Sequence, residues 1–162
     1  YLAAFGPNDD VALVIKDFGL GGFYRMVSYR EKILEIKRRR NVPEIIYTDA
    51  DMATWQLIAL YRSCDCFAFP YRGEGFGMPM LEAMACGLPV IASRVMGNEE
   101  LVCHGETGLL FDLSHPTDLV ASIIELATNS STRRKMAACA RETVIIRYSW
   151  RAAARSYATL FQ

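Results

Sequence analysis

The stretch from Cys66 to Cys86 constrains the fold more than any other part of this 162-residue chain. It begins with a short apolar run, Cys66 to Phe69, of the kind that forms a buried parallel strand. A glycine-rich loop follows, and Pro79 then suits the first position of a helix, because its missing N–H would be unpaired there anyway. A strand, a glycine loop and a helix from Pro79 to about Cys86 predict one unit of an α/β fold.

Two carboxylates accompany this loop, Glu74 within it and Glu82 in the helix. We expect free backbone N–H groups near Met78, Met80 and Leu81, where the start of a helix favours a phosphate. We place Glu82 in the same first turn, and because it would repel a phosphate, it should accept hydrogen bonds from a ribose diol. Glu74 would reach another part of the ligand, such as a sugar. The alternative is a solvated turn followed by a helix with a favourable acid near its start.

The segment GEGFGMPMLEAMACGLPVIAS, with seven residues between Glu74 and Glu82, resembles the donor-binding signature of the group 1 glycosyltransferases. The resemblance extends through Gly97, Glu99 and Glu100 to TGLLF at 107–111, and more loosely over the whole chain. Members of this family are retaining enzymes with two Rossmann-like domains, the GT-B fold. The resemblance implies that Glu74, as the catalytic residue, contacts the transferred sugar. It also implies that Glu82 contacts the ribose of a nucleoside diphosphate, and that the amides between them contact the sugar and diphosphate.

Apolar segments with the length of strands alternate with segments of helical periodicity along the chain. This alternation predicts an α/β fold with a Rossmann-like, doubly wound parallel sheet. The expected strands are 11–15, 44–47, 66–69, 89–92 and 109–111. The expected helices are 23–39, 53–63, 79–86, a short one from Gly97, one around 119–127, 132–147 and 150–161, with residues 1–5 as the tail of another.

Polar residues at the ends of the first two strands add to the candidate site, because open α/β sheets bind ligands at the carboxyl ends of their strands. Lys16 either faces a donor phosphate or is an ordinary lysine at the end of a strand. Either Tyr47, Thr48 and Asp49 line a base pocket through their backbone, or the aspartates Asp49 and Asp51 only cap the next helix. The candidate donor-binding residues are Lys16, Tyr47, Thr48, Glu74, Gly75, Phe76, Gly77, Met78, Met80, Leu81 and Glu82.

Three other features invite functional interpretations. The glycines between Asp17 and Phe23 do not match G-x-G-x-x-G, since Tyr24 stands where the third glycine would be, which disfavours a nicotinamide site. Glu99 either receives a hydroxyl of the ligand or places an acid in the first turn of a short helix. His104 and His115 are expected to be surface or capping residues.

The charge balance and the cysteines bear on partners and location. Eighteen basic and eighteen acidic residues argue against a nucleic-acid surface, and the run from Arg38 to Arg40 is expected to be a solvated helix end. No apolar run approaches the ~20 residues that span a bilayer, and no signal peptide is visible. Five cysteines, an odd number and several in apolar stretches, favour a reducing compartment. We therefore expect a cytoplasmic protein, with contact of the full-length enzyme to the cytoplasmic face of a membrane left open.

No metal is expected, because neither Cys64-x-Cys66 nor Cys103-His104 has a second pair at zinc spacing. The resemblance covers only the carboxyl-terminal half of a GT-B enzyme. We therefore interpret residues 1–162 as one nucleotide-sugar-binding domain, a fragment without its acceptor-binding domain and its own first strand, inactive alone. The enzyme would transfer a hexose from a UDP- or GDP-type donor with retention. The alternatives are a non-catalytic nucleotide-sugar-binding module and a dehydrogenase of Rossmann type, which the two glutamates disfavour.

The last predicted helix has an apolar stripe formed by Trp150, Ala153, Ala154, Tyr157 and Phe161. The resemblance implies that this helix crosses towards the acceptor-binding domain. We therefore expect part of its aromatic face to be exposed in this chain.

Overall fold

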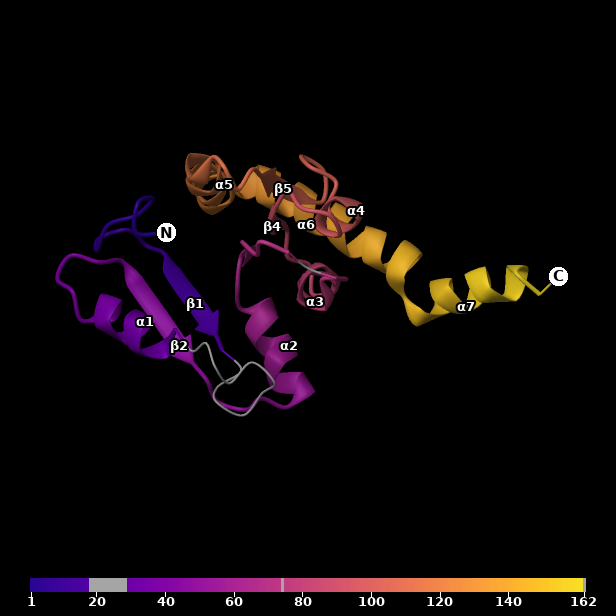
Figure 1. Cartoon of the computed structure of the whole chain (residues 1–162), viewed down its shortest axis with the longest axis horizontal. Helices are drawn as coiled ribbons and strands as arrows, with labels where there is room; N and C mark the ends of the chain where they lie inside the picture. Colours follow the sequence, from indigo (N-terminus) through magenta and orange to yellow (C-terminus); the bar gives the residue numbers. More distant parts are fainter. Residues whose placement is uncertain (18–28, 74, 162) are drawn as a thin grey trace. The chain divides into compact units, whose positions relative to one another are not determined.

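The computed structural model describes residues 1–17, 29–73 and 75–161. The chain divides into two compact units, Tyr1–Gln56 and Leu57–Gln162, whose elements are labelled in Figure 1. The glycine run before Tyr24 and the first part of the helix expected from Phe23 lie outside the described residues.

The first unit contains a pair of parallel strands and one short helix. β1 (Ala12–Lys16) pairs with β2 (Glu44–Thr48), and the register places Lys16 opposite Thr48. α1 (Arg30–Lys37) packs beside β2. The strands expected at 11–15 and 44–47 are confirmed to within one residue, and the basic run after α1 is exposed as expected.

The amino-terminal segment is a turn, so the expectation that Tyr1 to Phe5 ends a helix is wrong. The amide of Phe5 donates to the carbonyl of Tyr1 at 3.1 Å, which closes a single turn. Gly6 and Pro7 follow, and a residue before proline is held away from helical torsions. The hydroxyl of Tyr1 donates to the carbonyl of Glu44 at 2.7 Å and so ties this turn to β2.

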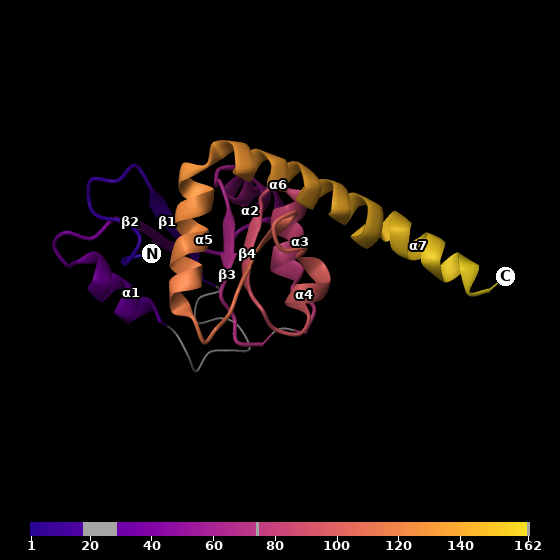
Figure 2. The same ribbon diagram turned by 90° about the horizontal axis from the view of Figure 1, so that it is seen from above.

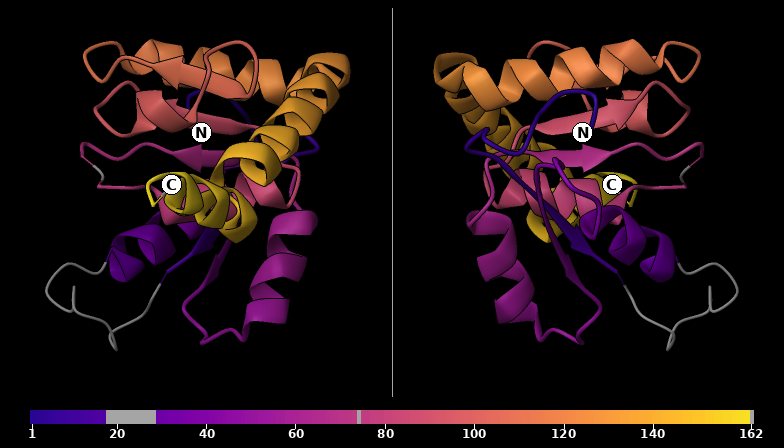
Figure 3. Two further views of the ribbon diagram at one scale, coloured as in Figure 1. Left: turned by 90° about the vertical axis from the view of Figure 1, so that its right-hand side faces the viewer. Right: turned by 90° about the vertical axis from the view of Figure 1, so that its left-hand side faces the viewer.

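The second unit is built on three parallel strands, β3 (Phe67–Phe69), β4 (Val90–Ser93) and β5 (Gly108–Phe111). β4 lies between the other two, as Figure 3 shows. All four residues of β4 are buried, which is typical of a parallel strand with helices on both faces.

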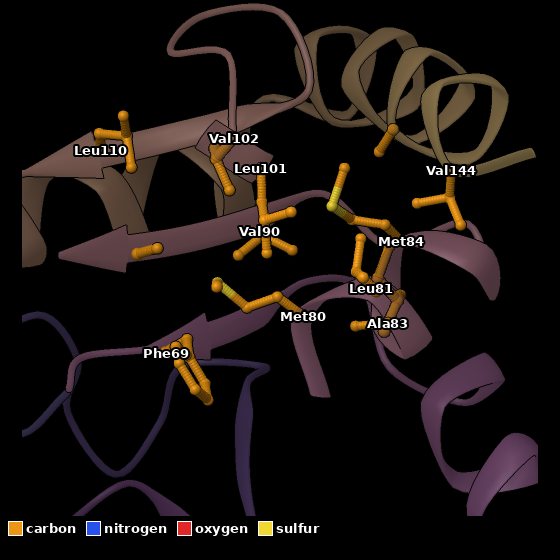
Figure 4. Packing of buried hydrophobic residues seen from close by; sticks show 13 residues of the cluster. Phe69, Met80, Leu81, Ala83, Met84, Val90, Leu101, Val102, Leu110 and Val144 are labelled. Carbon is orange, nitrogen blue, oxygen red and sulfur yellow. The ribbon is translucent and has the colours of Figure 1, made fainter. Parts of the chain in front are cut away.

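The side chains of β4 alternate between two hydrophobic clusters. Val90 and Ala92 join the larger cluster, which includes Met80 and Met84 of α3 (Met78–Ala85) and is drawn in Figure 4. Ile91 points to the other face and packs with residues of α5 (Pro116–Thr128). Figure 2 shows α3 and α5 on opposite sides of the strands. The unit is therefore doubly wound, and the predicted Rossmann-like α/β class is confirmed.

The backbone carbonyls at the carboxyl end of α3 all have hydrogen-bond partners. Gly87 has a φ of 85°, and its amide and that of Leu88 donate back to carbonyls of the last turn at 2.9 and 3.0 Å. This is a Schellman motif, which favours glycine because the left-handed backbone strains other residues. The guanidinium of Arg141, on a later helix, donates to the carbonyl of Ala85.

The remaining helices agree with the sequence in number but not in every boundary. They are α2 (Thr54–Arg62), α4 (Asn98–Leu101), α6 (Ser130–Thr143) and α7 (Trp150–Thr159). The helix expected at 132–147 ends as an α-helix at Thr143, and a π-helical segment, η2 (Val144–Tyr148), connects it to α7. The predicted cap of the last helix is confirmed, since the Ser149 side chain accepts a hydrogen bond from the amide of Ala152 at 3.2 Å.

α7 continues from η2 away from the strands of its unit (Figures 1 and 2). The side chain of Trp150 is 92% exposed and that of Phe161 is 87% exposed, and Tyr157 between them is also exposed. The expectation of an exposed aromatic face is therefore confirmed.

Candidate functional site

The chain enters the glycine loop from the carboxyl end of β3, where two contacts hold it. The rings of Phe69 and Tyr71 stack with their centroids 4.2 Å apart. The hydroxyl of Ser93, at the end of β4, donates to the carbonyl of Tyr71. These contacts fix the residues that lead into the loop, although Glu74 itself lies outside the described residues.

The start of α3 depends on a left-handed glycine. Gly77 precedes the helix with φ and ψ of 73° and 41°, so Met78 is the first helical residue and Pro79 the second. The amides of Met80 and Leu81 both donate to the carbonyl of Gly77, at 3.0 and 3.2 Å. The expectation that these two amides are free is therefore wrong, because the first turn uses them. Among the described residues no partner is found for the amide of Met78, the one left for an anion.

Side chains around this turn divide into an exposed and a buried set. Phe76 is 54% exposed and Met78 is 53% exposed, so both present apolar surface at the mouth of the loop. Met80 and Leu81 point into the core (Figure 4) and hold the helix against the sheet. The side chains of Phe76 and Met78 are therefore accessible to a ligand, whereas Met80 and Leu81 position the helix.

Glu82 lies one residue further from the start of α3 than we expected, because the helix begins at Met78, and this places it after the first turn, which holds no acid. Its carboxylate is exposed, and Oε2 accepts a hydrogen bond from the hydroxyl of Tyr61 on α2 at 3.2 Å. Burial raises the pKa of Tyr61, and the negative charge of Glu82 raises it further. Tyr61 was not predicted from the sequence, since a tyrosine 21 residues away carries no signal of this contact.

The segment after β4 contains an ion pair and a buried amide. Arg94 pairs with Glu99 at 3.0 Å, and Glu99 lies in the first turn of α4, which favours its interpretation as a helix-start acid. The side-chain amide of Asn98 is fully buried, and its nitrogen donates to the carbonyl of Ser93 at 2.9 Å. Its oxygen has no partner among the described residues.

In the first unit, the carboxyl ends of β1 and β2 bring together several of the predicted residues. The ammonium of Lys16 donates to the carbonyl of the adjacent Asp17, and the hydroxyl of Tyr47 donates to the Asp17 carboxylate at 2.9 Å. Desolvation, and then this carboxylate, raise the pKa of Tyr47. The carbonyl of Thr48 accepts from the amide of Asp17 at 2.9 Å. Lys16, Tyr47 and Thr48 thus lie at the carboxyl edge of the sheet formed by β1 and β2, as predicted.

The aspartate expected to cap the next helix has another partner. Asp49 forms an ion pair with Arg30 at 3.4 Å, with both side chains partly exposed. The side chain at the start of α2 that forms a capping hydrogen bond is instead that of Gln56. Its oxygen accepts a hydrogen bond from the amide of Ala53 at 2.8 Å. This contact is half of a capping box.

The histidines behave as structural residues. The Nδ1 atom of His104 accepts a hydrogen bond from the amide of Leu110 at 2.9 Å, and His115 is the residue before the first turn of α5. Both are exposed. Within residues 1–17, 29–73 and 75–161, no group of three or more His, Cys, Asp or Glu side chains could hold a metal ion.

The sequence pattern of the family described as glycosyl transferases group 1 matches residues 8–143. The match includes both parallel sheets and the helix that carries Glu82. The chain belongs to this family. Its fold is that of the carboxyl-terminal, Rossmann-like domain of the group 1 GT-B glycosyltransferases, which sets aside the dehydrogenase alternative.

Two curated group members give the scale of the similarity. An uncharacterized glycosyltransferase of Methanocaldococcus jannaschii is 39% identical over 95 residues, which are 59% of this chain and 27% of that protein. A D-inositol 3-phosphate glycosyltransferase of Corynebacterium efficiens is 38% identical over 106 residues, which are 65% of this chain and 25% of that protein. The chain spans about a quarter of the length of these relatives.

Solved structures of group 1 glycosyltransferases share the fold. The carboxyl-terminal domain of a family member from Francisella tularensis matches with a TM-score of 0.63 and 25% identity, over 75% of this chain and 60% of that one. HepE of Anabaena, crystallised with UDP-glucose, matches with a TM-score of 0.66 and 23% identity, over 93% of this chain and 40% of that one. In the part of this chain that the structure describes, the helices are too short or too polar to cross a membrane.

Proposed function

We propose that this chain is the donor-binding domain of a retaining glycosyltransferase that transfers a hexose from a UDP- or GDP-type nucleotide sugar to an acceptor. The observation that carries the proposal is the exposed carboxylate of Glu82, one turn into a helix that starts at the left-handed Gly77. A carboxylate at this place can accept hydrogen bonds from both hydroxyls of a ribose diol. The amide of Met78 and the positive end of the helix favour the neighbouring diphosphate.

The sugar end of the donor belongs to the loop before α3 in this proposal. Glu74 contacts the transferred sugar, and Gly75 allows the backbone to come close to it, since a Cβ there would meet nothing within 4 Å. Phe76 and Met78 supply exposed apolar surface beside the loop. The proposal is supported by HepE of Anabaena, which shares the fold over 40% of its chain and was crystallised in complex with UDP-glucose.

The acceptor-binding part of the enzyme lies outside this chain in our proposal, so the chain alone binds donors without turning them over. The coverage of the relatives supports this division, because the matched region is only about a quarter of each of them. No protein-bound metal is proposed, and the amide of Met78 at the positive end of α3 favours the leaving diphosphate. All five cysteines are free thiols, which suits a reducing compartment such as the cytoplasm.

Isothermal titration of the 162-residue chain with UDP, GDP and their glucose conjugates tests the proposal. We expect one of the two bases to bind, and the sugar-bearing donor to bind more tightly than its diphosphate. Glu74→Ala should remove only that extra affinity, because this loop faces the sugar. The matched control is Glu142→Gln, an exposed acid on α6, which should bind like the wild type. Absence of binding for all four ligands would refute the donor-binding function.

A further inference from the structure

The contact between α2 and α3 joins Tyr61 to the carboxylate that the proposed function places on the ribose. The Tyr61 hydroxyl of α2 donates to Oε2 of Glu82 on α3 at 3.2 Å, and the two residues lie 21 positions apart in the sequence. Within the described part of the chain, Glu82 is in none of the ion pairs, so this hydrogen bond is the specific restraint on its head group.

The ring of Tyr61 is itself held in place. It packs against the hydrophobic cluster under α3, and it meets Phe67 of β3 edge to face, with centroids 5.7 Å apart and planes at 74°. Edge-to-face pairs of this kind favour a fixed ring orientation. The hydroxyl therefore reaches Glu82 from an anchored position on a neighbouring helix, whereas the glutamate extends from the exposed face of its own helix.

The chemistry of the pair leaves Glu82 able to bind a ligand. A carboxylate has about four lone-pair positions on its two oxygens, and Tyr61 occupies one of them on Oε2. Burial and the nearby carboxylate both raise the pKa of Tyr61, so its hydroxyl keeps the proton that it donates across the neutral range. Oε1 and the remaining position on Oε2 can then receive two hydroxyls.

We propose that Tyr61 is a positioning residue for donor binding, which orients the Glu82 carboxylate towards the ribose hydroxyls of the nucleotide. The inference rests on the proposed function and adds a residue outside the loop and helix α3 to it. The glutamate would otherwise sample several rotamers in water, and each productive encounter would have to select one of them. Tyr61 reduces this cost because it holds one carboxylate oxygen before the ligand arrives.

The test compares Tyr61→Phe with the wild type by titration with UDP or GDP, whichever the wild type binds more tightly. The variant keeps the ring and its packing on Phe67. We expect its Kd to rise about three- to tenfold. The lower part of this range is favoured, because the bond from Tyr61 to Glu82 is longer than the usual ~2.7–2.8 Å of an O–H···O hydrogen bond. Tyr148→Phe is the matched control, because that hydroxyl also donates on this unit, to the carbonyl of Glu100 at 3.0 Å, and its loss should leave the Kd unchanged.

A 2′,3′-dideoxy analogue of the same nucleotide separates positioning from packing. It lacks the hydroxyls that Glu82 would receive, so wild type and Tyr61→Phe should bind it equally. An equal loss for both nucleotides would show that Tyr61 acts on the fold and would overturn the inference. An unchanged Kd of Tyr61→Phe for the complete nucleotide would also overturn the inference.

Two further outcomes distinguish this inference from the function on which it rests. In a Glu82→Ala background, Tyr61→Phe should have no additional effect, and a persistent loss there would overturn the positioning role alone. If the wild type binds neither nucleotide, the proposed function fails and this inference falls with it. Thermal unfolding of each variant verifies that folded proteins are compared. If Tyr61→Phe proves unstable, Glu82→Ala is still informative, because it must then bind the complete nucleotide and the dideoxy analogue with equal Kd.

Discussion

At the scale of a single residue, the proposed contact with ribose depends on the exposed carboxylate of Glu82. Replacing it with glutamine keeps the size of the side chain but exchanges a charged acceptor for a neutral amide with two donors of its own. We predict that Glu82→Gln weakens binding of the nucleoside diphosphate by ~1–3 kcal/mol, with little change in stability because the side chain is exposed. Calorimetric titration measures the first quantity and thermal unfolding the second. Equal affinities for variant and wild type would contradict the ribose assignment.

Asn98 makes a prediction about stability at the same scale. Its buried amide nitrogen donates to the carbonyl of Ser93, and an aspartate in its place would set a second acceptor against that carbonyl. We predict that Asn98→Asp lowers the free energy of unfolding by ~3 kcal/mol or more at neutral pH, because an unpaired charge is buried. The control is Asn129→Asp, which keeps a good cap for α6 and exchanges an exposed hydrogen bond to Glu125 for a repulsion screened by solvent, so it should change stability by less than ~1 kcal/mol.

Chemical denaturation of the two variants measures both changes. If Asn98→Asp were as stable as the wild type, the amide would have to be turned the other way, with its oxygen facing a donor.

At the scale of elements, the start of α3 depends on the conformation of one residue. Gly77 adopts a φ of 73°, in the left-handed region that costs other residues roughly 1–2 kcal/mol. We predict that Gly77→Ala lowers the free energy of unfolding by about this amount. Gly73→Ala is the control in the same loop, because its φ is not in the left-handed region and its Cβ would meet no atom within 4 Å. Urea denaturation should separate the two variants, and equal stabilities would show that the turn adapts without strain.

Several elements could be predicted from sequence because their signals are local. The apolar run before the glycine loop, the proline near the start of α3 and the capping Ser149 all act within a few residues. The extent of α3 was predicted to within one residue, yet its first turn was misplaced because Gly77, and not Met78, precedes the helix. The error mattered, since it moved Glu82 from the first turn to the second.

Other features could not be read from the sequence because they depend on residues distant in the chain. The contact of Tyr61 with Glu82 and the bond from Arg141 to α3 each join separate helices. The π-helical segment η2 has an apolar spacing like that of an ordinary helix, and nothing in the structure explains why it departs from one. Likewise, the predicted cap at Asp49 lost to an ion pair with Arg30, which lies 19 residues earlier (49 − 30).

For the molecule as a whole, the exposed face of α7 predicts behaviour that depends on concentration. Burial of one large aromatic side chain is worth ~1.5–3 kcal/mol, so Trp150 and Phe161 together favour self-association of this chain. We predict that the amides of α7 exchange faster than those of the buried strand β4, and that their protection rises as the protein is concentrated. Hydrogen exchange across a dilution series measures this.

The variant with Trp150→Ser and Phe161→Ser serves as the control for that experiment, because it removes the two most exposed aromatic side chains and should abolish the dependence on concentration. Strong protection of wild-type α7 at every dilution would instead show that the helix is fully packed within a single copy of the chain.

The closed end of α3 has a further consequence for the energetics of ligand capture. Its last carbonyls are satisfied by the turn at Gly87 and by the guanidinium of Arg141, so the helix is fastened at the end opposite to the proposed diphosphate. Ordering of this helix is therefore completed when the protein folds and not when a nucleotide arrives. The binding of a nucleotide at the amino end of α3 should therefore carry a small entropic penalty on the side of the protein. The helix is a rigid receptor, and the mobility that is lost belongs to the hydrated anion.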